Sequence, residues 1–243
     1  MAIDASTDIK VYKTKSTAVA DGEASGDGLG GYRSLDEITT NVDENLFDDI
    51  TAAESESGDT EYRGFMLKNT HATLSFVSAK VYMSTNSPNS DLTTQLETSG
   101  SESTVYVTSA SAFPASGAFF CEDEEITYTG KTASTFTGCT RGANGTSKVQ
   151  HTVGTLCEHN QIRMAVEEPS SKTTGSIVTI ENESTAPAGA TFTAPYTFAT
   201  GLSIGTLAAS EFYGIWIRRK VPAGAGAKTG IYCTIARKGE TEE

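Results

Sequence analysis

The sequence has no apolar run long enough to cross a bilayer. A membrane-spanning helix needs about 18 consecutive apolar residues, and no stretch of the chain approaches that length. The segment after Met1 turns polar at Asp4 and no apolar core follows it, so no signal peptide is predicted. We therefore expect no membrane partner, and folding in a reducing cytosol.

Closely paired cysteines are also missing. Four cysteines stand alone, with no C-x-x-C pair among them: Cys121, Cys139, Cys157 and Cys233. His151 and His159 lie near the first three, but structural zinc sites usually take their ligands in close pairs. No local pattern pairs a cysteine with a histidine, as a thiol nucleophile would require. The spacing therefore predicts buried free thiols without zinc.

Basic residues are scarce. The chain has 18 Lys and Arg against 31 Asp and Glu, which gives a net charge of −13. Residues 1–60 alone hold 14 acidic and 4 basic side chains, so they carry −10 of that total. Nucleic-acid binding needs a basic footprint, so no nucleic-acid partner is expected. The pattern indicates an acidic, solvated flank on a nearly neutral body.

Catalytic motifs are absent as well. The sequence contains no G-x-S-x-G motif and only three histidines. The acidic run Glu122–Glu125 lacks the spacing of a calcium loop, and residues 141–146 lack the Lys of a phosphate loop. We interpret the acidic run as a solvated turn, residues 141–146 as a tight turn, and His71 as a turn residue of a hairpin. Arg218–Lys220 are interpreted as solvated charges at a strand end, and pairing with acids of the same chain or of a neighbour is the alternative. The sequence thus predicts no enzyme and no catalytic, cofactor-binding or metal-binding residue.

The clearest signal that is present is alternation along residues 61–83. Phe65 and Leu67 point to one face and Met66 to the other, and a second alternating stretch follows. A polar break at residues 69–71 supplies a turn between the two stretches. We interpret the whole region as the central hairpin of a β-sandwich.

A second strand pair is predicted near the end of the chain, at Glu211–Val221 and Thr229–Ala236. The first of these strands is apolar on both faces, so we place it inside a sheet that is covered on both sides. Trp216, the only tryptophan, lies in its middle. We predict that Trp216 is a core residue and not a sugar-binding platform.

Composition predicts an all-β fold, since 23 Gly and many Ser and Thr favour turns and short strands. Residues 1–30 are polar and Gly-rich, and are interpreted as an extended N-terminal arm ordered only by a neighbour. From about Thr98 the strands become very short, which indicates a small β-domain inserted at a loop. The predicted architecture is a jelly-roll-like β-sandwich in two parts, residues 31–97 and 159–243, around an insert at 98–158.

Five short strands are predicted within the insert: Ser103–Val107, Gly117–Cys121, Glu125–Thr129, Thr135–Thr137 and Gly154–Cys157. Before the insert, residues 45–50 are interpreted as a helical turn or a short strand. Residues 48–59 are interpreted as an acidic loop.

The insert also carries a set of spaced motifs. An acidic strand ends in Tyr128-Thr-Gly, a turn reads Gly138-Cys-Thr-Arg-Gly, and His151-Thr-Val-Gly precedes the last strand. Together with Phe113-Pro-Ala-Ser-Gly, these motifs resemble a small β-module that recurs in structural proteins of tailed bacteriophages. The match covers roughly residues 104–158. It implies a spacer or contact unit on a virion surface.

The flanking chain is similar to virion proteins of tailed phages, and the matching pieces cover most of the sandwich: Asn45–Ile50, Gly58–Arg63, Lys68–Leu74, Asn182–Pro187 and Glu211–Arg219. This resemblance implies a non-enzymatic particle component that is present in many copies. We accordingly expect a homo-oligomer located in the virion and assembled in the cytoplasm of a host bacterium.

Within that class we expect a capsid decoration (cement) protein that binds the major capsid protein, because an extended arm and a compact sandwich suit a clamp between subunits. A neck, tail or baseplate component is the alternative. A host-attachment module that binds or hydrolyses carbohydrate is a third reading. Tyr12, Tyr32 and Tyr196 are available as sugar platforms, but no pair of catalytic carboxylates can be nominated.

Overall fold

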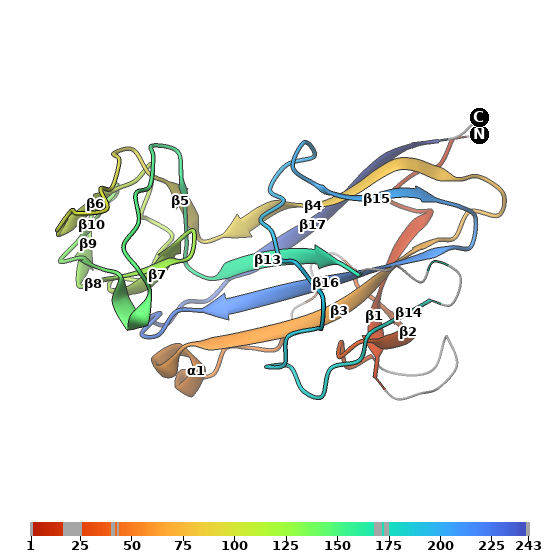
Figure 1. Cartoon of the computed structure of the whole chain (residues 1–243), viewed down its shortest axis with the longest axis horizontal. Coiled ribbons are helices and arrows are strands. Elements are labelled where there is room, and N and C mark those ends of the chain that lie inside the picture. Colours follow the sequence, from red (N-terminus) through yellow and green to blue (C-terminus); the bar gives the residue numbers. More distant parts are fainter. Residues whose placement is uncertain are drawn as a thin grey trace.

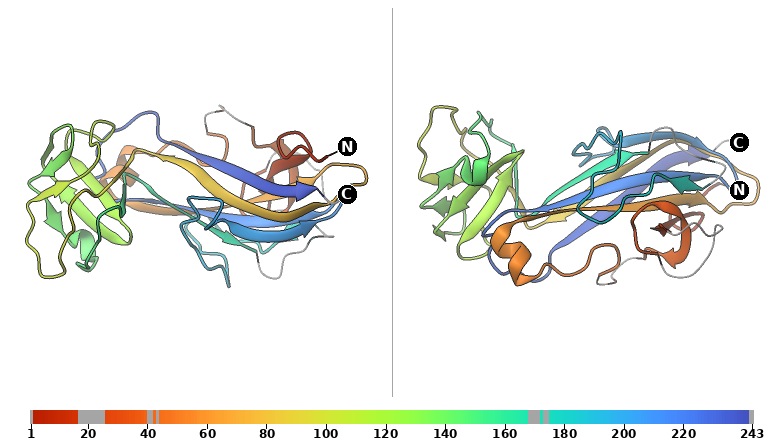
Figure 2. Two further views of the ribbon diagram at one scale, coloured as in Figure 1. Left: turned by 90° about the horizontal axis from the view of Figure 1, so that it is seen from above. Right: turned by 60° about the horizontal axis from the view of Figure 1, so that its bottom comes forward.

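Strands make up almost all of the regular structure. The computed structural model describes residues 2–16, 26–39, 42, 44–167, 172 and 175–241. Antiparallel strands in these ranges build two sheets that share one core, and a small module lies at one end (Figures 1 and 2). The predicted all-β, sandwich-like fold is confirmed.

The larger sheet has six strands in the order β13-β16-β3-β1-β2-β14. In that order their bounds are Gln161–Val166, Phe212–Val221, Asp59–Asn69, Ile9–Lys15, Gly31–Glu37 and Ser176–Ile177. The smaller sheet has three strands in the order β15-β4-β17. Their bounds are Leu202–Leu207, Phe76–Ser87 and Tyr232–Thr241.

The strands predicted as hairpins lie in different sheets. β3 belongs to the six-stranded sheet and β4 to the three-stranded sheet, and β16 and β17 are divided in the same way. Both hairpin predictions are therefore wrong, since the chain crosses between sheets at each connection. Phe65 and Leu67 of β3 and Val81 and Met83 of β4 all enter one core. The apolar faces of these strands meet across the sandwich, which side-by-side pairing would not allow.

Asn69 and His71 hold the connection between β3 and β4. Asn69 Nδ2 donates to the carbonyls of Leu74 and Leu207, both at 2.9 Å. His71 Nδ1 accepts from the N–H groups of Thr73 and Leu74, at 3.2 and 3.0 Å. His71 thus lies in the connection between the two strands, as predicted, but that connection crosses between sheets and is not a hairpin turn.

The six-stranded sheet is buried on both faces. Ile215 of β16 enters the core between the sheets. Its neighbour Trp216 enters a second cluster on the outer face, with Met66, Ile177 and Phe212 among its members. β16 is thus an interior strand with two apolar faces, as predicted. Trp216 is 0% exposed, so its assignment to a core is confirmed.

Residues 9–15 do not belong to a free arm. They form β1, which lies between β2 and β3 and pairs with both. Ile9 and Val11 are buried between the sheets. The predicted extended arm is wrong for this stretch, because β1 pairs with a strand on each side and places its apolar side chains in the core. Residues 17–25 of that prediction lie outside the described ranges.

The inserted module begins earlier in the chain than predicted. Its strands form a five-stranded sheet, β11-β8-β7-β12-β5, and a three-stranded sheet, β6-β10-β9. β5 pairs with β12, so the strands of the module span residues 89–158 instead of 98–158. The core of the module, around Phe113, Phe119 and Phe136, is a cluster separate from the core between the large sheets.

The strands of the module are β5 (Asn89–Asp91), β6 (Thr104–Tyr106), β7 (Gly117–Cys121), β8 (Glu124–Tyr128), β9 (Gly130–Lys131), β10 (Thr135–Thr137), β11 (Thr140–Arg141) and β12 (Leu156–Glu158). A short 3₁₀ turn, η1 (Ala143–Gly145), follows β11. This turn lies within residues 141–146, as predicted.

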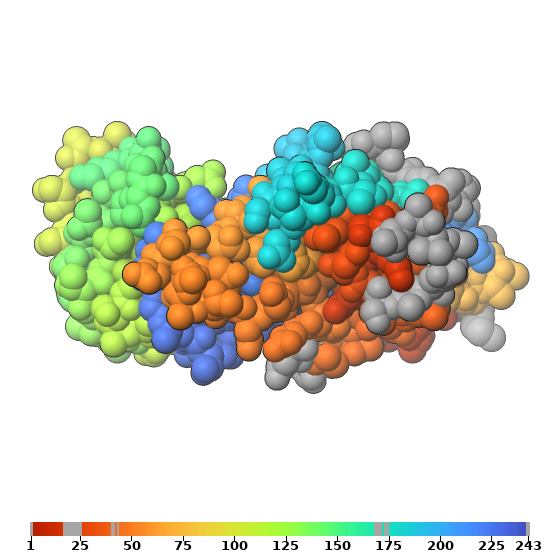
Figure 3. All heavy atoms as spheres, turned by 90° about the horizontal axis from the view of Figure 1, so that it is seen from below, coloured from red at the N-terminus to blue at the C-terminus, as the bar shows by residue number. Residues whose placement is uncertain are grey.

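A short helix, α1 (Ala52–Ser57), occupies the stretch predicted as an acidic loop. Thr51 and Glu54 form a capping box, in which each side chain accepts from the backbone N–H of the other residue. The carbonyl of Ser55 accepts from the N–H groups of Gly224 and Ala225 in the loop before β17. Figure 3 shows the orange segment around α1 lying against this blue loop, beside the green module.

The two ends of the described chain lie together, at the end of the molecule farthest from the module (Figure 1). The N–H of Ile3 donates to Thr241 Oγ1 at 2.8 Å, and Arg237 Nε donates to the Ala5 carbonyl at 2.9 Å. In the residues described, no helix has the length and apolar character needed to span a membrane.

Candidate functional site

The strongest concentration of buried charge in the module surrounds Glu124, the first residue of β8. Its carboxylate is 0% exposed and accepts from Arg141 Nε and Nη2 at 2.9 and 2.7 Å. It also accepts from the backbone N–H groups of Gly142 and Val149, at 3.0 and 3.1 Å. These donors hold the pKa of Glu124 below its usual value, although burial alone would raise it.

Arg141 extends this cluster in the opposite direction. Its Nη1 donates to the carbonyl of Glu97 at 2.6 Å and to the carboxylate of Glu102 at 3.1 Å. The guanidinium is 1% exposed and is fully engaged. The planar guanidinium group donates several hydrogen bonds at fixed angles, and it therefore orients the loops that accept them. Arg141 therefore fastens three separate segments of the module to β8.

His151 completes the cluster from a third place in the sequence. One ring nitrogen lies 2.9 Å from Glu122 and the other 2.9 Å from Glu124. Burial opposes the charged form of His151, but the Cys121 sulfur beside the ring, followed by the two carboxylates, raises its pKa to about 9. The prediction of a solvated acidic turn at Glu122–Glu125 is wrong for its second half, because Glu124 and Glu125 are 1% and 4% exposed.

The module also brings together two of the four cysteines. Cys121 and Cys157 are direct partners across β7 and β12, and their sulfur atoms are 3.7 Å apart. All four cysteines are free thiols, and Cys139 and Cys233 are only half-buried. A Cys–His–Glu arrangement thus exists at Cys121, His151 and Glu124, although sequence spacing gave no sign of it. Cys121 is 0% exposed, so a bulky substrate has no access to its sulfur.

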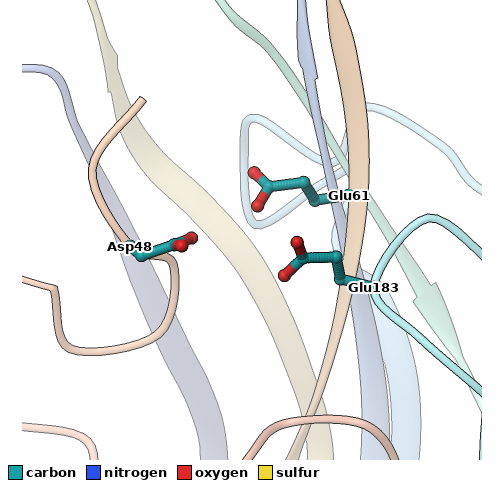
Figure 4. A group of neighbouring side chains, drawn as sticks. All are labelled: Asp48, Glu61 and Glu183. Carbon is teal, nitrogen blue, oxygen red and sulfur yellow. The ribbon is translucent and has the colours of Figure 1, made fainter. Parts of the chain in front are cut away.

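Three carboxylates gather on the sandwich, and Figure 4 shows them pointing toward one another. Asp48 comes from the segment before α1, Glu61 from β3 and Glu183 from the segment after β14, and their oxygens lie within 4.8 Å of one another. Such a set has the oxygen donors that a hard cation prefers. Burial raises the pKa of Glu61 to about 7, although Arg219 and Arg63 act to lower it.

Two arginines already neutralise this group. Arg219 contacts Glu61 at 2.5 Å and Asp48 at 3.6 Å. Arg63 contacts Asp48 at 3.5 Å, Glu61 at 3.7 Å and the Glu183 carboxylate at close range. The ring of Phe47 lies 4.8 Å from the Arg219 guanidinium and 5.6 Å from that of Arg63. This arrangement ties two surface segments to β3 and β16, and a cation would have to displace an arginine.

The cluster also corrects the interpretation of Arg218–Lys220 as solvated charges. Arg219 is 8% exposed and lies in the ion pairs just described. Arg218 Nη2 donates to Gln161 Oε1 at 2.5 Å. Lys220 Nζ lies 4.6 Å from the centre of the Phe120 ring in the module. Three successive residues at the end of β16 therefore contact three different parts of the molecule. Arg219 contacts the segment before α1, Arg218 contacts β13, and Lys220 contacts the module.

A third buried network joins the module to the sandwich. Glu158, the last residue of β12, accepts from Asn86 Nδ2 at 2.7 Å and from Arg163 Nη1 at 2.8 Å. The Tyr196 hydroxyl donates to the same carboxylate and accepts from Arg163 Nη1 at 2.7 Å. Nearby, Gln161 Nε2 donates to the Glu122 carbonyl at 2.5 Å. The joint is therefore a set of directed polar contacts.

His159 lies beside this joint, at a surface pocket of about 550 Å³ that α1 and residues 224–229 also line. Burial, and then the charge of Lys228, lower the pKa of His159 to about 4. The imidazole is 1% exposed. It is neutral near pH 7 and a weak proton acceptor, which does not suit general-base catalysis.

The aromatic residues named as sugar platforms do not form a common surface. The hydroxyl of Tyr196 is engaged at the joint with the module. The ring of Tyr12 lies under the Arg33 guanidinium at 4.7 Å. Tyr32 is half-buried in β2, where it pairs with Ser176 of β14. The structure does not bring these three side chains together.

Comparisons of the chain with protein-family models, with curated proteins and with solved structures give no match.

Proposed function

We propose that the chain is a non-enzymatic structural component of a tailed-phage virion, placed on the capsid as a decoration protein that binds the major capsid protein. The proposal rests on the resemblance of residues 104–158 to a phage β-module and of the flanking chain to phage virion proteins. The geometry of the signature residues supports it.

One observation carries the proposal. Glu124, Arg141 and His151 of the resemblance pattern turn inward, and Glu124 bonds to both of the others. Charged residues of a pattern that are buried and bonded inside the module preserve its fold and do not form an exposed reactive site. Such a module suits a unit that spaces or contacts other proteins on a particle surface.

The shape of the molecule agrees with such a role. The module lies at one end of the sandwich and the ends of the described chain lie at the other (Figure 1). The buried contacts of Glu158 with Arg163 and Asn86 hold the module in a defined orientation. One end can then bind the shell while the other projects from it, repeated in every copy of a homo-oligomer.

The test is electron cryo-microscopy of the particle whose genome encodes this chain, with quantitative mass spectrometry of its proteins. We expect hundreds of copies, with density for the two sheets resting on the major capsid protein. A multiple of six or twelve copies at one vertex would instead assign the chain to the neck, tail or baseplate. Its absence from purified particles would overturn the proposal.

A matched variant makes the assignment of density secure. Replacing residues 92–155 with a two-residue turn removes most of the module and keeps the joint residue Glu158. Particles assembled with this variant should lose density at one end of each copy and keep the density of the sandwich. Retention of the full density would show that the chain had been placed wrongly in the map.

A further inference from the structure

The Cys121 and Cys157 thiols meet the geometric requirements of a disulfide. As direct partners on antiparallel strands their Cα atoms are about 4.5–5.5 Å apart, within the range of about 4.4–6.8 Å that a disulfide spans. Their sulfur atoms are 3.7 Å apart. Bond formation therefore requires small side-chain rotations and no rearrangement of the sheet.

The surroundings make the two thiols unequal. A hydrogen bond from Cys157, and then the neighbouring imidazole of His151, lower the pKa of the Cys121 thiol. Burial and the adjacent Cys121 raise the pKa of Cys157 well above its usual value. Because the thiolate is the reactive form, Cys121 is the attacking residue and Cys157 the resolving one.

Access to the pair favours a very small oxidant. Both cysteines are 0% exposed, so glutathione disulfide and similar reagents cannot reach their sulfur atoms without local opening. A surface pocket of about 440 Å³ lies next to the cluster, and its lining includes Glu122 and Glu124, the two residues that hold His151. This pocket reaches Glu122, the residue that follows Cys121 in the chain, so a molecule of nearly the size of water can approach the pair from this side.

We propose that Cys121 and Cys157 form a peroxide-sensitive pair that closes into a cross-strand disulfide. The Cys121 thiolate attacks one oxygen of hydrogen peroxide, the O–O bond breaks, and the departing hydroxide takes up the proton that Cys121 released. The Cys157 sulfur then attacks the Cys121 sulfenic acid and forms the S–S bond. The hydroxyl leaves with the Cys157 proton as a second water.

In total, the two thiols lose two electrons and form one disulfide, and one hydrogen peroxide is reduced to two water molecules. The new bond links β7 to β12, the strand that leads into the joint at Glu158. It locks the module in its folded form. This inference concerns the module alone, so it stands or falls independently of a role in the virion.

The test treats the native full-length chain with hydrogen peroxide, then alkylates the remaining thiols under denaturing conditions and maps the peptides. We expect joint loss of the Cys121 and Cys157 thiols, a linked peptide pair, and full recovery with dithiothreitol. Cys139 and Cys233 should keep their thiols. Earlier oxidation of Cys139 or Cys233, or unlinked oxidation of Cys121 and Cys157, would overturn the proposal.

Single substitutions separate the two roles. In Cys157→Ala, dimedone should trap a sulfenic acid on Cys121, since no resolving thiol remains. In Cys121→Ala, Cys157 should resist peroxide. Cys139→Ser serves as the matched control, because it removes the third cysteine of the module and should leave disulfide formation unchanged. A dimedone adduct on Cys157 in the Cys121→Ala chain would contradict the assigned order.

Discussion

Trp216 is buried on the outer face of the six-stranded sheet. In a β-sandwich this face, which points away from the core between the sheets, is commonly exposed to solvent. The Trp216 ring is fully buried there, among Met66, Ile177 and Phe212. Its Nε1 donates to Glu167 at 2.7 Å, so its polar atom is satisfied as well. Trp216 thus bonds to the residue that directly follows β13 and shares an apolar cluster with Ile177 of β14.

Replacement of Trp216 by Ala should lower the free energy of unfolding by about 3–5 kcal/mol, the usual range for a large buried aromatic residue. Trp216→Phe keeps most of the apolar surface and should lose less. Urea unfolding followed by circular dichroism measures both. Since the chain has a single tryptophan, iodide quenching checks the burial directly. Ready quenching in the native protein would contradict it.

Glu61 should give the sandwich an unusual pH dependence. Burial raises its pKa from 4.5 to about 7 in the folded protein. At a pH between these two values, Glu61 is protonated in the folded chain and ionised in the unfolded chain. The resulting stabilisation is complete below about pH 4.5 and is lost as the pH rises through 7.

Compared with Glu61→Gln, which cannot titrate, the wild type should lose on the order of 3 kcal/mol of relative stability between pH 4.5 and 7. Denaturant unfolding of both proteins across this range measures the difference. Glu183→Gln is the matched control, because it removes a carboxylate of the same cluster at a position that is 41% exposed. A difference of opposite sign would mean that the contact with Arg219 outweighs burial.

At the scale of elements, the cluster around Glu124 connects β8 to the loops of the module and stabilises its fold. Glu124→Gln should destabilise the module by about 3–5 kcal/mol, because Arg141 would keep its buried charge and lose its main partner. Glu122→Gln provides the control. Glu122 also contacts His151 but is 63% exposed, so its loss should cost less than about 1 kcal/mol. Limited proteolysis within residues 92–155 reports the opening of the module, and equal effects of the two changes would contradict this ranking.

Sequence patterns located the strands well but not their partners. β6, β7, β10 and β16 lie at or within the stretches predicted for them, because alternation and turn residues mark strand ends locally. Alternation also tells which face of β3 is apolar. It does not tell whether β4 lies beside that strand or across the core from it, since both placements bury the same side chains. The paired sheets settle that choice.

The buried clusters were beyond sequence reasoning for a related reason. Glu124, Arg141 and His151 each belong to a separate motif of the sequence. The motifs of Glu124 and Arg141 are interpreted as local turns, and that of His151 is placed before the last strand of the module. They meet because β11 pairs with β8 and because His151 bridges to Leu96. The one sequence signal that these three residues lie close together is that all of them belong to the motifs shared with the phage β-module. For α1, the spacing of Thr51 and Glu54 is the sequence pattern of a capping box, which is the local signal that a helix begins there.

At the scale of the whole molecule, the described residues form two units, the sandwich with apolar clusters on both faces of its larger sheet and the module with a core of its own. The core around Phe119 and Phe136 is separate from the core between the large sheets. Asp91 and Leu156 are direct partners in the β5–β12 pair. A two-residue Asn-Gly turn can therefore replace residues 92–155 and close a short hairpin at the joint.

This shortened chain should fold cooperatively, with an unfolding free energy lower by only about 1–3 kcal/mol. That loss reflects missing contacts such as the hydrogen bonds from Gln161 to Glu122 and Asp123. Trp216 fluorescence during urea unfolding measures it, because the cluster around that ring lies on the sandwich. Adding Glu158→Gln to the shortened chain should cost about 3–5 kcal/mol more, since Arg163 then lacks its buried partner. If the shortened chain lost cooperative unfolding altogether, the two cores would have to fold as one unit, and the module could not be an independent insertion.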